Sequence, residues 1–172
     1  MIGHVMSTLG VLTSSDSRSR GKMEDVSGNL VIELMKDRGY ELCQYQVVPD
    51  EPDIIRNILI KWADTEQLDL IVTTGATSLT TRDIMPEATT SVLDRLIPGM
   101  AEAMRVEGMK FTPMAMLSRG VAGIRGTSLV LNLPGSPKAV RENLGAVLDV
   151  LPHAIEMIQN ERHGHPSTPE NN

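Results

Sequence analysis

Short apolar runs recur along this chain and alternate with stretches in which apolar residues have helical spacing. Four of the runs have the length and the β-branched content of buried strands, and they span residues 4–13, 42–48, 68–72 and 128–133. One helical stretch stops at Gly39, and others begin near Pro52, Pro86 and Pro98. This alternation predicts right-handed βαβ units on a mainly parallel sheet.

The size of the chain predicts one domain. A chain of 172 residues with 41% hydrophobic side chains is long enough to bury a single core. We expect this domain over residues 1–160, followed by a polar tail over residues 161–172. Its fold class is α/β, with three layers in which helices flank the sheet on both faces. Pro152 predicts a kink or a break in the last helical stretch, residues 138–159.

Composition excludes several classes of protein. The net charge of −6 and the aromatic content of 2% oppose binding to a nucleic-acid backbone and stacking on its bases. The single cysteine, Cys43, cannot form an intrachain disulfide, and no apolar run reaches the ~20 residues of a membrane span. The first basic residue is Arg18, so the start lacks the charged segment of a secretory signal. We expect a cytoplasmic protein with no nucleic-acid partner and no membrane segment.

Ligands of parallel α/β sheets bind where the carboxyl ends of the strands and their loops gather. That rule selects residues 14–21, 49–53, 75–83, 118–126 and 134–138. Basic residues in or beside these stretches give a local field that opposes the net charge. Taken singly, each is also typical of a solvated surface. They are Arg18, Arg20, Lys22, Arg82, Arg119, Arg125 and Lys138.

Two of these stretches carry groups that hold anions. After the third strand, Gly75, Thr77 and Ser78 offer backbone N–H groups and hydroxyls. This loop lacks the lysine of a Walker A motif and also fits a plain connecting turn. The segment Pro134-Gly135-Ser136-Pro137-Lys138 adds a hydroxyl and an ammonium at a helix start. Ser136 there also fits an ordinary helix cap, and the two interpretations are compatible.

Two aspartates follow strands whose ends can share one cleft. Asp50 follows the second strand, and Asp83 lies in the loop after the third. Paired carboxylates can hold Mg²⁺ between phosphate groups. The alternative is structural, with Asp50 as the N-cap of its helix, and with Asp83 either in an ion pair with Arg82 or bracing its own loop. Spacing alone favours the structural alternative.

An ordered series of motifs resembles one known family over nearly the whole chain, from Val5 to about Ile158. The motifs are Thr13-Ser14-Ser15-Asp16-Ser17-Arg18-Ser19-Arg20-Gly21, Asp25-Val26-Ser27-Gly28, Val48-Pro49-Asp50-Glu51, Thr73-Thr74-Gly75, Arg82-Asp83-Ile84-Met85-Pro86-Glu87-Ala88-Thr89, Ala115-Met116-Leu117-Ser118-Arg119-Gly120 and Asn132-Leu133-Pro134-Gly135-Ser136-Pro137-Lys138-Ala139-Val140. Together they resemble the molybdopterin-binding family that contains the bacterial MogA- and MoaB-type proteins.

The resemblance implies a molybdopterin-binding fold and an enzyme that uses Mg²⁺ and ATP to adenylylate the phosphate of molybdopterin, releasing pyrophosphate. It implies a homotrimer, with a hexamer as the alternative, and hand-over to a molybdate-inserting protein. Family members carry essential aspartates in the motifs of Asp50 and Asp83, so the resemblance assigns both to catalysis and to the metal. It assigns substrate binding to Ser14, Asp16, Gly75, Ala76, Thr77, Ser78, Ser118, Arg119, Pro134, Gly135, Ser136 and Lys138.

The chain departs from the family pattern at three positions. Similar active proteins have glycine in place of Ala76 and Ser78, and threonine in place of Met85, where it would be an N-cap. A Cβ atom at either loop position strains the backbone where φ is positive, or it holds a phosphate farther from the backbone N–H groups. The alternative is that Ala76 has a negative φ and that a hydrogen bond from the Ser78 hydroxyl replaces the lost approach. The departures favour a molybdopterin-binding protein without transfer activity, whereas the retained aspartates oppose it. An interaction module without chemistry is a third interpretation.

Overall fold

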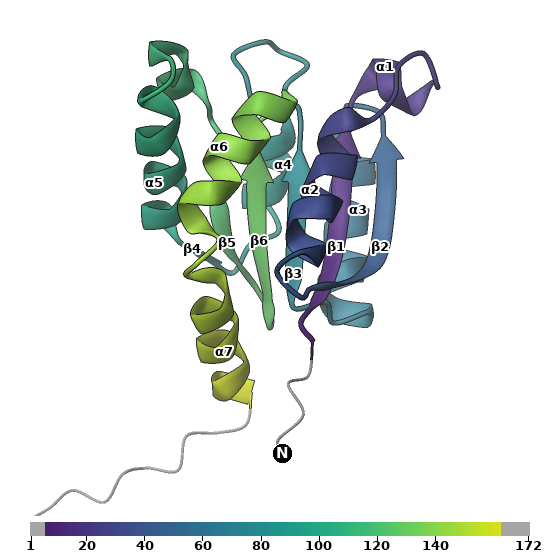
Figure 1. Cartoon of the computed structure of the whole chain (residues 1–172). Helices are drawn as coiled ribbons and strands as arrows, with labels where there is room; N and C mark the ends of the chain where they lie inside the picture. Colours follow the sequence, from purple (N-terminus) through teal and green to yellow (C-terminus); the bar gives the residue numbers. More distant parts are fainter. Residues whose placement is uncertain (1–5, 163–172) are drawn as a thin grey trace, which may run out of the picture.

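The computed structural model describes residues 6–162, which form a sheet with helices on both faces (Figure 1). The strands are β1 Thr8–Ser14, β2 Glu41–Val48, β3 Leu70–Thr74, β4 Arg95–Leu96, β5 Ala122–Arg125 and β6 Ser128–Leu133. The helices are α1 Asp16–Ser19, α2 Val26–Lys36, α3 Pro52–Ile60, α4 Met85–Thr90, α5 Pro98–Met109, α6 Pro137–Val147 and α7 Leu151–Arg162. A π-helical turn, η1 Lys61–Thr65, extends α3, and a 3₁₀ turn, η2 Pro113–Leu117, follows α5.

The strand order of the sheet is β2-β1-β3-β6-β5-β4. The first four of these strands run parallel, so their carboxyl ends meet at one end of the sheet (Figure 1). β3 and β6 are buried along their whole length, which explains why their sequences are mainly continuous apolar runs. The predicted α/β class with a mainly parallel sheet flanked by helices is confirmed. Within residues 6–162, no helix combines the length and apolar character needed to cross a bilayer.

Each face of the sheet carries its own apolar core. Successive side chains of a strand point to opposite faces, so Val11 joins the core under α2 and α6, whereas Leu12 joins the core under α3 and α4. Trp62 is fully buried in the second core. It packs so closely over Gly10 that an added Cβ there would lie 2.7 Å from the indole. This packing fixes the strands and the loops at their ends.

The antiparallel edge of the sheet differs from the prediction. Residues 118–126, predicted as a loop, contain β5, which pairs antiparallel with β6 and with the two-residue strand β4. Strands this short carry too few residues for a detectable alternation. Because β5 runs back along β6, Arg125 lies opposite Ser128, at the amino end of β6. There its guanidinium pairs with Asp64, so the placement of Arg125 in the basic cluster is wrong.

The C-terminal helical stretch is divided, as Pro152 predicts. α6 ends at Val147 and α7 begins at Leu151, so Pro152 lies in the first turn of α7, where a missing N–H is tolerated. α7 extends to Arg162, past the predicted domain end at residue 160. The predicted tail from residue 163 onward and the start of the predicted first strand at His4 lie outside the described residues.

Asp25 joins three elements of the first βαβ unit from a buried position. Its carboxylate caps α2 by accepting the Gly28 N–H at 3.0 Å, and it accepts the hydroxyls of Thr13 at 2.6 Å and Tyr45 at 2.7 Å. Burial, reinforced by the hydrogen bond to Asp25, raises the pKa of Tyr45 above its usual range, so Tyr45 remains a donor. An added Cβ at Gly28 would lie 2.1 Å from Asp25 Oδ2, which explains the glycine.

We predict that Asp25→Ala lowers the free energy of unfolding by about 3 kcal/mol, because two hydroxyls and one N–H lose their acceptor. Urea unfolding followed by circular dichroism measures this change. Asp53→Ala is the matched control, since the Asp53 carboxylate is 84% exposed and its ion pair with Arg56 contributes less than ~1 kcal/mol. Equal losses in the two variants would show that Asp25 does not join these elements.

Candidate functional site

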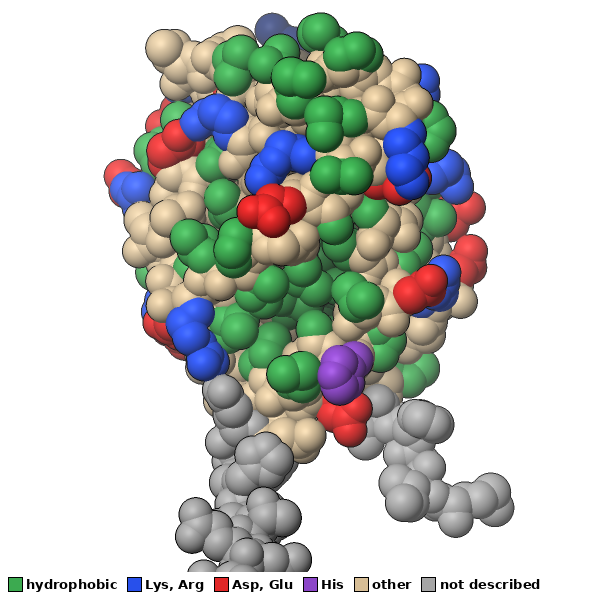
Figure 2. All heavy atoms as spheres, turned by 90° about the vertical axis from the view of Figure 1, so that its left-hand side faces the viewer, with side chains coloured by type: hydrophobic (Ala, Val, Ile, Leu, Met, Phe, Trp, Pro, Cys, Tyr) green, Lys and Arg blue, Asp and Glu red, His purple; other side chains and the backbone are tan. Residues whose placement is uncertain are grey.

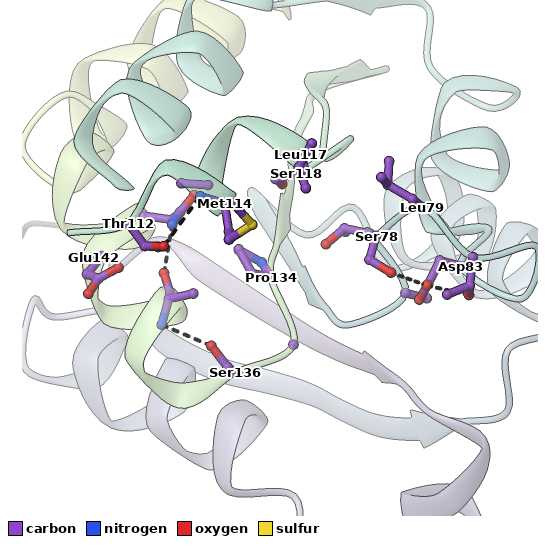
Figure 3. Close-up of a pocket in the computed structure, with 17 residues that line it drawn as sticks. Ser78, Leu79, Asp83, Thr112, Met114, Leu117, Ser118, Pro134, Ser136 and Glu142 are labelled. Carbon is purple, nitrogen blue, oxygen red and sulfur yellow. Dashed lines mark hydrogen bonds between the residues drawn. The ribbon is translucent and has the colours of Figure 1, made fainter. Parts of the chain in front are cut away.

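A cavity of about 620 Å³ opens at the carboxyl ends of β3 and β6, between the loop after β3, η2 and the start of α6 (Figure 3). Its size is that of a small-molecule or cofactor site. It brings together most of the residues assigned to the site by resemblance. Those that line it are Ala76, Thr77, Ser78, Asp83, Ser118, Pro134, Gly135 and Ser136.

The turn from Pro134 to Ser136 forms one wall, and two hydroxyls fix its peptide orientation. Thr74 donates to the Pro134 carbonyl at 2.6 Å, and Ser27 donates to the Gly135 carbonyl at 2.7 Å. In a trans peptide the N–H points away from the carbonyl, so the N–H groups of Gly135 and Ser136 face away from these hydroxyls. Ser136 also caps α6, since its hydroxyl accepts the Ala139 N–H at 3.2 Å. The predicted cap is confirmed, and the helix start favours an anion.

Glycines let the two loops approach each other behind this wall. Gly75 has a φ of +93°, and an added Cβ there would lie 2.3 Å from the Ser14 carbonyl oxygen. A Cβ on Gly135 would lie 3.3 Å from the Gly75 Cα. The missing Cβ of Gly75 therefore lets the loop after β3 lie against the end of β1, and the missing Cβ of Gly135 lets the Pro134–Ser136 turn lie against Gly75.

Ala76 adopts a φ of +53°, in the left-handed region that favours glycine. Ala76 therefore has the positive φ angle expected at a position where the family pattern has glycine, and its Cβ atom makes this backbone conformation about 1 kcal/mol less favourable. A backbone hydrogen bond from the Met85 N–H to the Ala76 carbonyl, 3.0 Å long, holds this conformation.

The N-cap of α4 is Ile84, and the Met85 side chain is fully buried, so the interpretation of Met85 as a lost N-cap is wrong.

Asp83 is held by the hydroxyls of its own loop. Ser78 and Thr80 both donate to Oδ2, Thr80 at 2.6 Å. Burial raises the pKa of the Asp83 carboxyl, but the two hydroxyl donors and the nearby Arg119 charge outweigh it, so the pKa lies below its usual range. Asp83 is therefore a charged carboxylate on the cavity wall, and both hydroxyls bind the same oxygen, Oδ2.

Asp50 belongs to a second hydrogen-bonded group, beside the cavity. Its Oδ1 accepts the Ser14 hydroxyl at 2.5 Å, and its Oδ2 accepts the Asp16 N–H at 3.2 Å. The N-cap position of α3 belongs to Glu51, so Asp50 does not cap that helix. The structural alternative for Asp50 is therefore wrong, and its carboxylate organises the loop after β1.

Arg82 connects this group to the Asp83 loop. It pairs with Asp16 at 2.8 Å and with Glu51 at 3.3 Å, so the predicted pair of Arg82 with Asp83 is wrong, whereas the other structural alternative, in which Asp83 braces its own loop, agrees with its bonds to Ser78 and Thr80. Hydrogen bonds from Arg82 lower the pKa of Asp16. In the part of the chain that the structure describes, no three acidic, histidine or cysteine side chains converge to hold a metal ion. A metal there would rely on fewer carboxylates and on its substrate.

The two predicted cationic binding residues lie outside the cavity lining. Arg119 donates to the Ser78 carbonyl at 2.7 Å, and also to the Asp83 carbonyl and the Glu87 carboxylate. It therefore braces the loop from outside. Lys138 has a 76% exposed side chain and borders a neighbouring hollow.

The sequence interpretation missed the wall that η2 and α6 supply. On α6, the wall residues have helical spacing from the Ser136 cap, so this signal was present in the sequence. η2 offers no periodic pattern that would have revealed it. The missed residues of this wall are Thr112, Met114, Ala115, Leu117, Ala139, Glu142 and Asn143, whereas Leu79 and Thr80 lie in the selected stretch 75–83 without having been assigned a role.

Comparison with known proteins supplies the family. A family model described as "Probable molybdopterin binding domain" matches residues 10–153. The chain belongs to this molybdopterin-binding family. The molybdopterin adenylyltransferase of Helicobacter pylori J99 is 45% identical over 152 residues, which cover 87% of this chain and 86% of that protein. The molybdopterin adenylyltransferase of Escherichia coli K12 is 39% identical over 144 residues, covering 82% and 73%.

A solved structure agrees with this assignment. The crystal structure of the molybdopterin biosynthesis enzyme MoaB from Thermus thermophilus has a TM-score of 0.86 and 52% identity, and the match covers 90% of this chain and 98% of that one. The molybdopterin-binding fold implied by the motifs is therefore confirmed.

We predict different consequences of a glycine substitution at Ala76 and at Ser78. Ala76→Gly relieves the positive φ and raises the free energy of unfolding by roughly 0.5 kcal/mol, the net of lost strain and gained chain entropy. Ser78→Gly removes a donor to the Asp83 carboxylate, so the pKa of that carboxyl rises. Urea unfolding measures the first effect, and NMR titration of the Asp83 carboxyl carbon measures the second. A less stable Ala76→Gly, or an unmoved Asp83 titration in Ser78→Gly, would contradict this description of the loop.

Proposed function

We propose that this chain transfers an adenylyl group from ATP to the phosphate of molybdopterin, with release of pyrophosphate, in molybdenum cofactor biosynthesis. The observation that carries the proposal is the cavity itself. A turn suited to phosphate and the charged Asp83 lie on opposite sides of it (Figure 3). The relatives named molybdopterin adenylyltransferase support the reaction class.

The reaction depends on placement more than on acid–base chemistry. An oxygen of the molybdopterin phosphate bonds to the α-phosphorus of ATP, and the bond from that phosphorus to the oxygen bridging to the β-phosphorus breaks. A phosphate monoester is largely ionised at neutral pH, so its attack needs no strong base. The N–H groups of Gly135 and Ser136, at the positive end of α6, hold and orient that phosphate. Alignment of two bound reactants supplies much of the rate.

The oxygen donors at the site fit Mg²⁺. This ion prefers hard oxygen ligands and usually takes one or two carboxylates together with substrate phosphates and waters. Asp83 offers one carboxylate, and Asp50 offers a second, whose oxygens each accept one hydrogen bond. We assign the ion to these two residues. When bound, it offsets the negative charge of the triphosphate.

The alternative is a molybdopterin-binding protein without transfer activity. The observation that favours it is the strained φ at Ala76, in a loop where similar enzymes have glycine. Incubation of purified protein with molybdopterin, Mg²⁺ and ATP, followed by chromatography, separates the two functions. Adenylylated molybdopterin supports transfer, and retained molybdopterin without this product supports the alternative.

Asp50→Asn and Asp83→Asn should each lower turnover at least ~100-fold, because a positioned charge beside the transferring phosphorus is lost. Turnover is measured from the adenylylated product, and thermal melting checks that each variant folds. Asp53→Asn is the control, since its exposed carboxylate on α3 faces solvent and should leave turnover near wild type. Near-normal turnover in both Asp50→Asn and Asp83→Asn would remove these residues from the chemistry.

We further propose a cytoplasmic homotrimer, with a hexamer as the alternative, that hands its product to a molybdate-inserting protein. Hydrophobic side chains gather on the face that α5 and the following turn present (Figure 2). Contiguous exposed apolar patches mark association surfaces on many proteins. The exposed apolar residues of this segment are Val106, Met109, Phe111, Met114, Met116 and Leu117.

Light scattering at micromolar concentration should give three times the chain mass of 18.8 kDa. Val106→Glu combined with Met116→Glu should reduce that mass, because burying unpaired like charges in an interface is costly. Met157→Lys is the control, since Met157 is equally exposed but lies on α7. A wild-type mass of one chain would exclude the trimer.

A further inference from the structure

The cavity contains a buried carboxylate that the proposed reaction does not use. Glu142 lies on α6, and its side chain is only 10% exposed. Within residues 6–162 it accepts no hydrogen bond, and its ion-pair partner, Lys138 Nζ, lies 3.9 Å from Oε1, beyond hydrogen-bond distance. Figure 3 shows Glu142 on the α6 side of the cavity, beyond Ser136. This largely buried carboxylate lines the cavity with acceptor capacity that no protein donor uses, so a ligand's donors can bind it.

The spacing between Glu142 and the phosphate-binding turn suits a ligand with a phosphate at one end and a ring system at the other. Ser136 caps α6, and Glu142 lies roughly 9 Å farther along the helix, at about 1.5 Å per residue. Ala139, Met114 and Leu117 line the same cavity with apolar groups. Apolar walls with a few placed polar groups are typical of sites for flat heterocycles.

A carboxylate distinguishes between the heterocycles of the two substrates. A pterin presents its ring N3–H and its 2-amino group side by side, and these two donors match the two oxygens of one carboxylate. Adenine presents its amino group beside ring N1, which is an acceptor and would face a carboxylate oxygen unfavourably. Glu142 therefore suits a pterin and disfavours adenine.

We propose that Glu142 selects the pterin: its carboxylate accepts hydrogen bonds from the N3–H and the 2-amino group of molybdopterin, while the phosphate of that molecule lies at the Pro134–Ser136 turn. This inference rests on the proposed function, because it names which substrate occupies the α6 side of the cavity. ATP then approaches from the side of Asp83.

The test measures the Kd of molybdopterin and the Kd of ATP separately, by calorimetric titration of wild type and Glu142→Gln. An amide keeps one acceptor and turns the other position into a donor, so the Kd of molybdopterin should rise at least about 10-fold while that of ATP stays within about 2-fold. Glu107→Gln is the matched control, since Glu107 borders the neighbouring hollow, as Glu142 also does, but does not line the cavity, and it pairs with Lys110. It should change neither Kd, and thermal melting checks the fold of both variants.

A measurement on the ligand side needs no folded variant. 6-Hydroxymethylpterin and 6-hydroxymethyllumazine, which carries a carbonyl in place of the 2-amino group, compete with molybdopterin for the wild-type protein. The pterin should compete at least about 10-fold better than the lumazine, because the lumazine lacks one donor. On Glu142→Gln the preference should reverse, because the amide offers one acceptor and one donor, which match the N3–H and the 2-carbonyl of the lumazine.

An unchanged Kd of molybdopterin in Glu142→Gln, or a larger effect on ATP than on molybdopterin, overturns the proposal. Equal competition by the two analogues on wild type overturns it as well. If wild type still forms adenylylated molybdopterin, these results leave the proposed function intact. A wild-type protein that neither binds molybdopterin nor forms product refutes the proposed function and, with it, this inference.

Discussion

The pairing of β3 with β6 positions the rest of the site. The two strands stay in register to their last residues, Thr74 and Leu133, so the loops that follow them begin side by side. Beyond the sheet, the Gly75 N–H donates to the Leu133 carbonyl at 3.2 Å, and the Thr74 hydroxyl donates to the Pro134 carbonyl at 2.6 Å. A slip of one residue would turn each buried side chain to the other face, so the two cores specify this register strongly. The cavity is a consequence of how the sheet packs.

The apolar pattern of the sequence predicted the parallel strands and the helices that cover them, because buried parallel strands are apolar runs and their covering helices have a clear period. It missed β4 and β5, and Arg125 was assigned to the wrong end of β6 for that reason. The loops of Gly75 and Ser136 were predictable from their residue types. Glu142 was not, because a helical carboxylate in a sequence resembles any solvated one. Its burial arises only in the folded chain, where α5 packs beside α6.

The site is suited to anions although the net charge is −6. The arginines near it are already paired: Arg82 with Asp16 and Glu51, and Arg119 with Glu87. They neutralise acidic neighbours and fix the loops that carry them. Backbone N–H groups and hydroxyls are left to meet phosphate, and these donors are directional where an ammonium is not. An acidic protein can bind anionic substrates in this way without a basic surface.

The strain at Ala76 is maintained by its neighbours. A residue with a Cβ at positive φ costs about 1 kcal/mol and persists only where the surroundings over-determine it. The Met85 N–H binds the Ala76 carbonyl, the Arg119 N–H binds the Thr77 carbonyl, and the Ser78 hydroxyl binds Asp83. Glycine at positions 76 and 78 would follow the same backbone path more easily but would lack one of the two hydroxyls that hold the Asp83 carboxylate in place. The loop of this chain therefore combines a strained backbone with a fixed carboxylate, which is an arrangement suited to placing charge beside a phosphate.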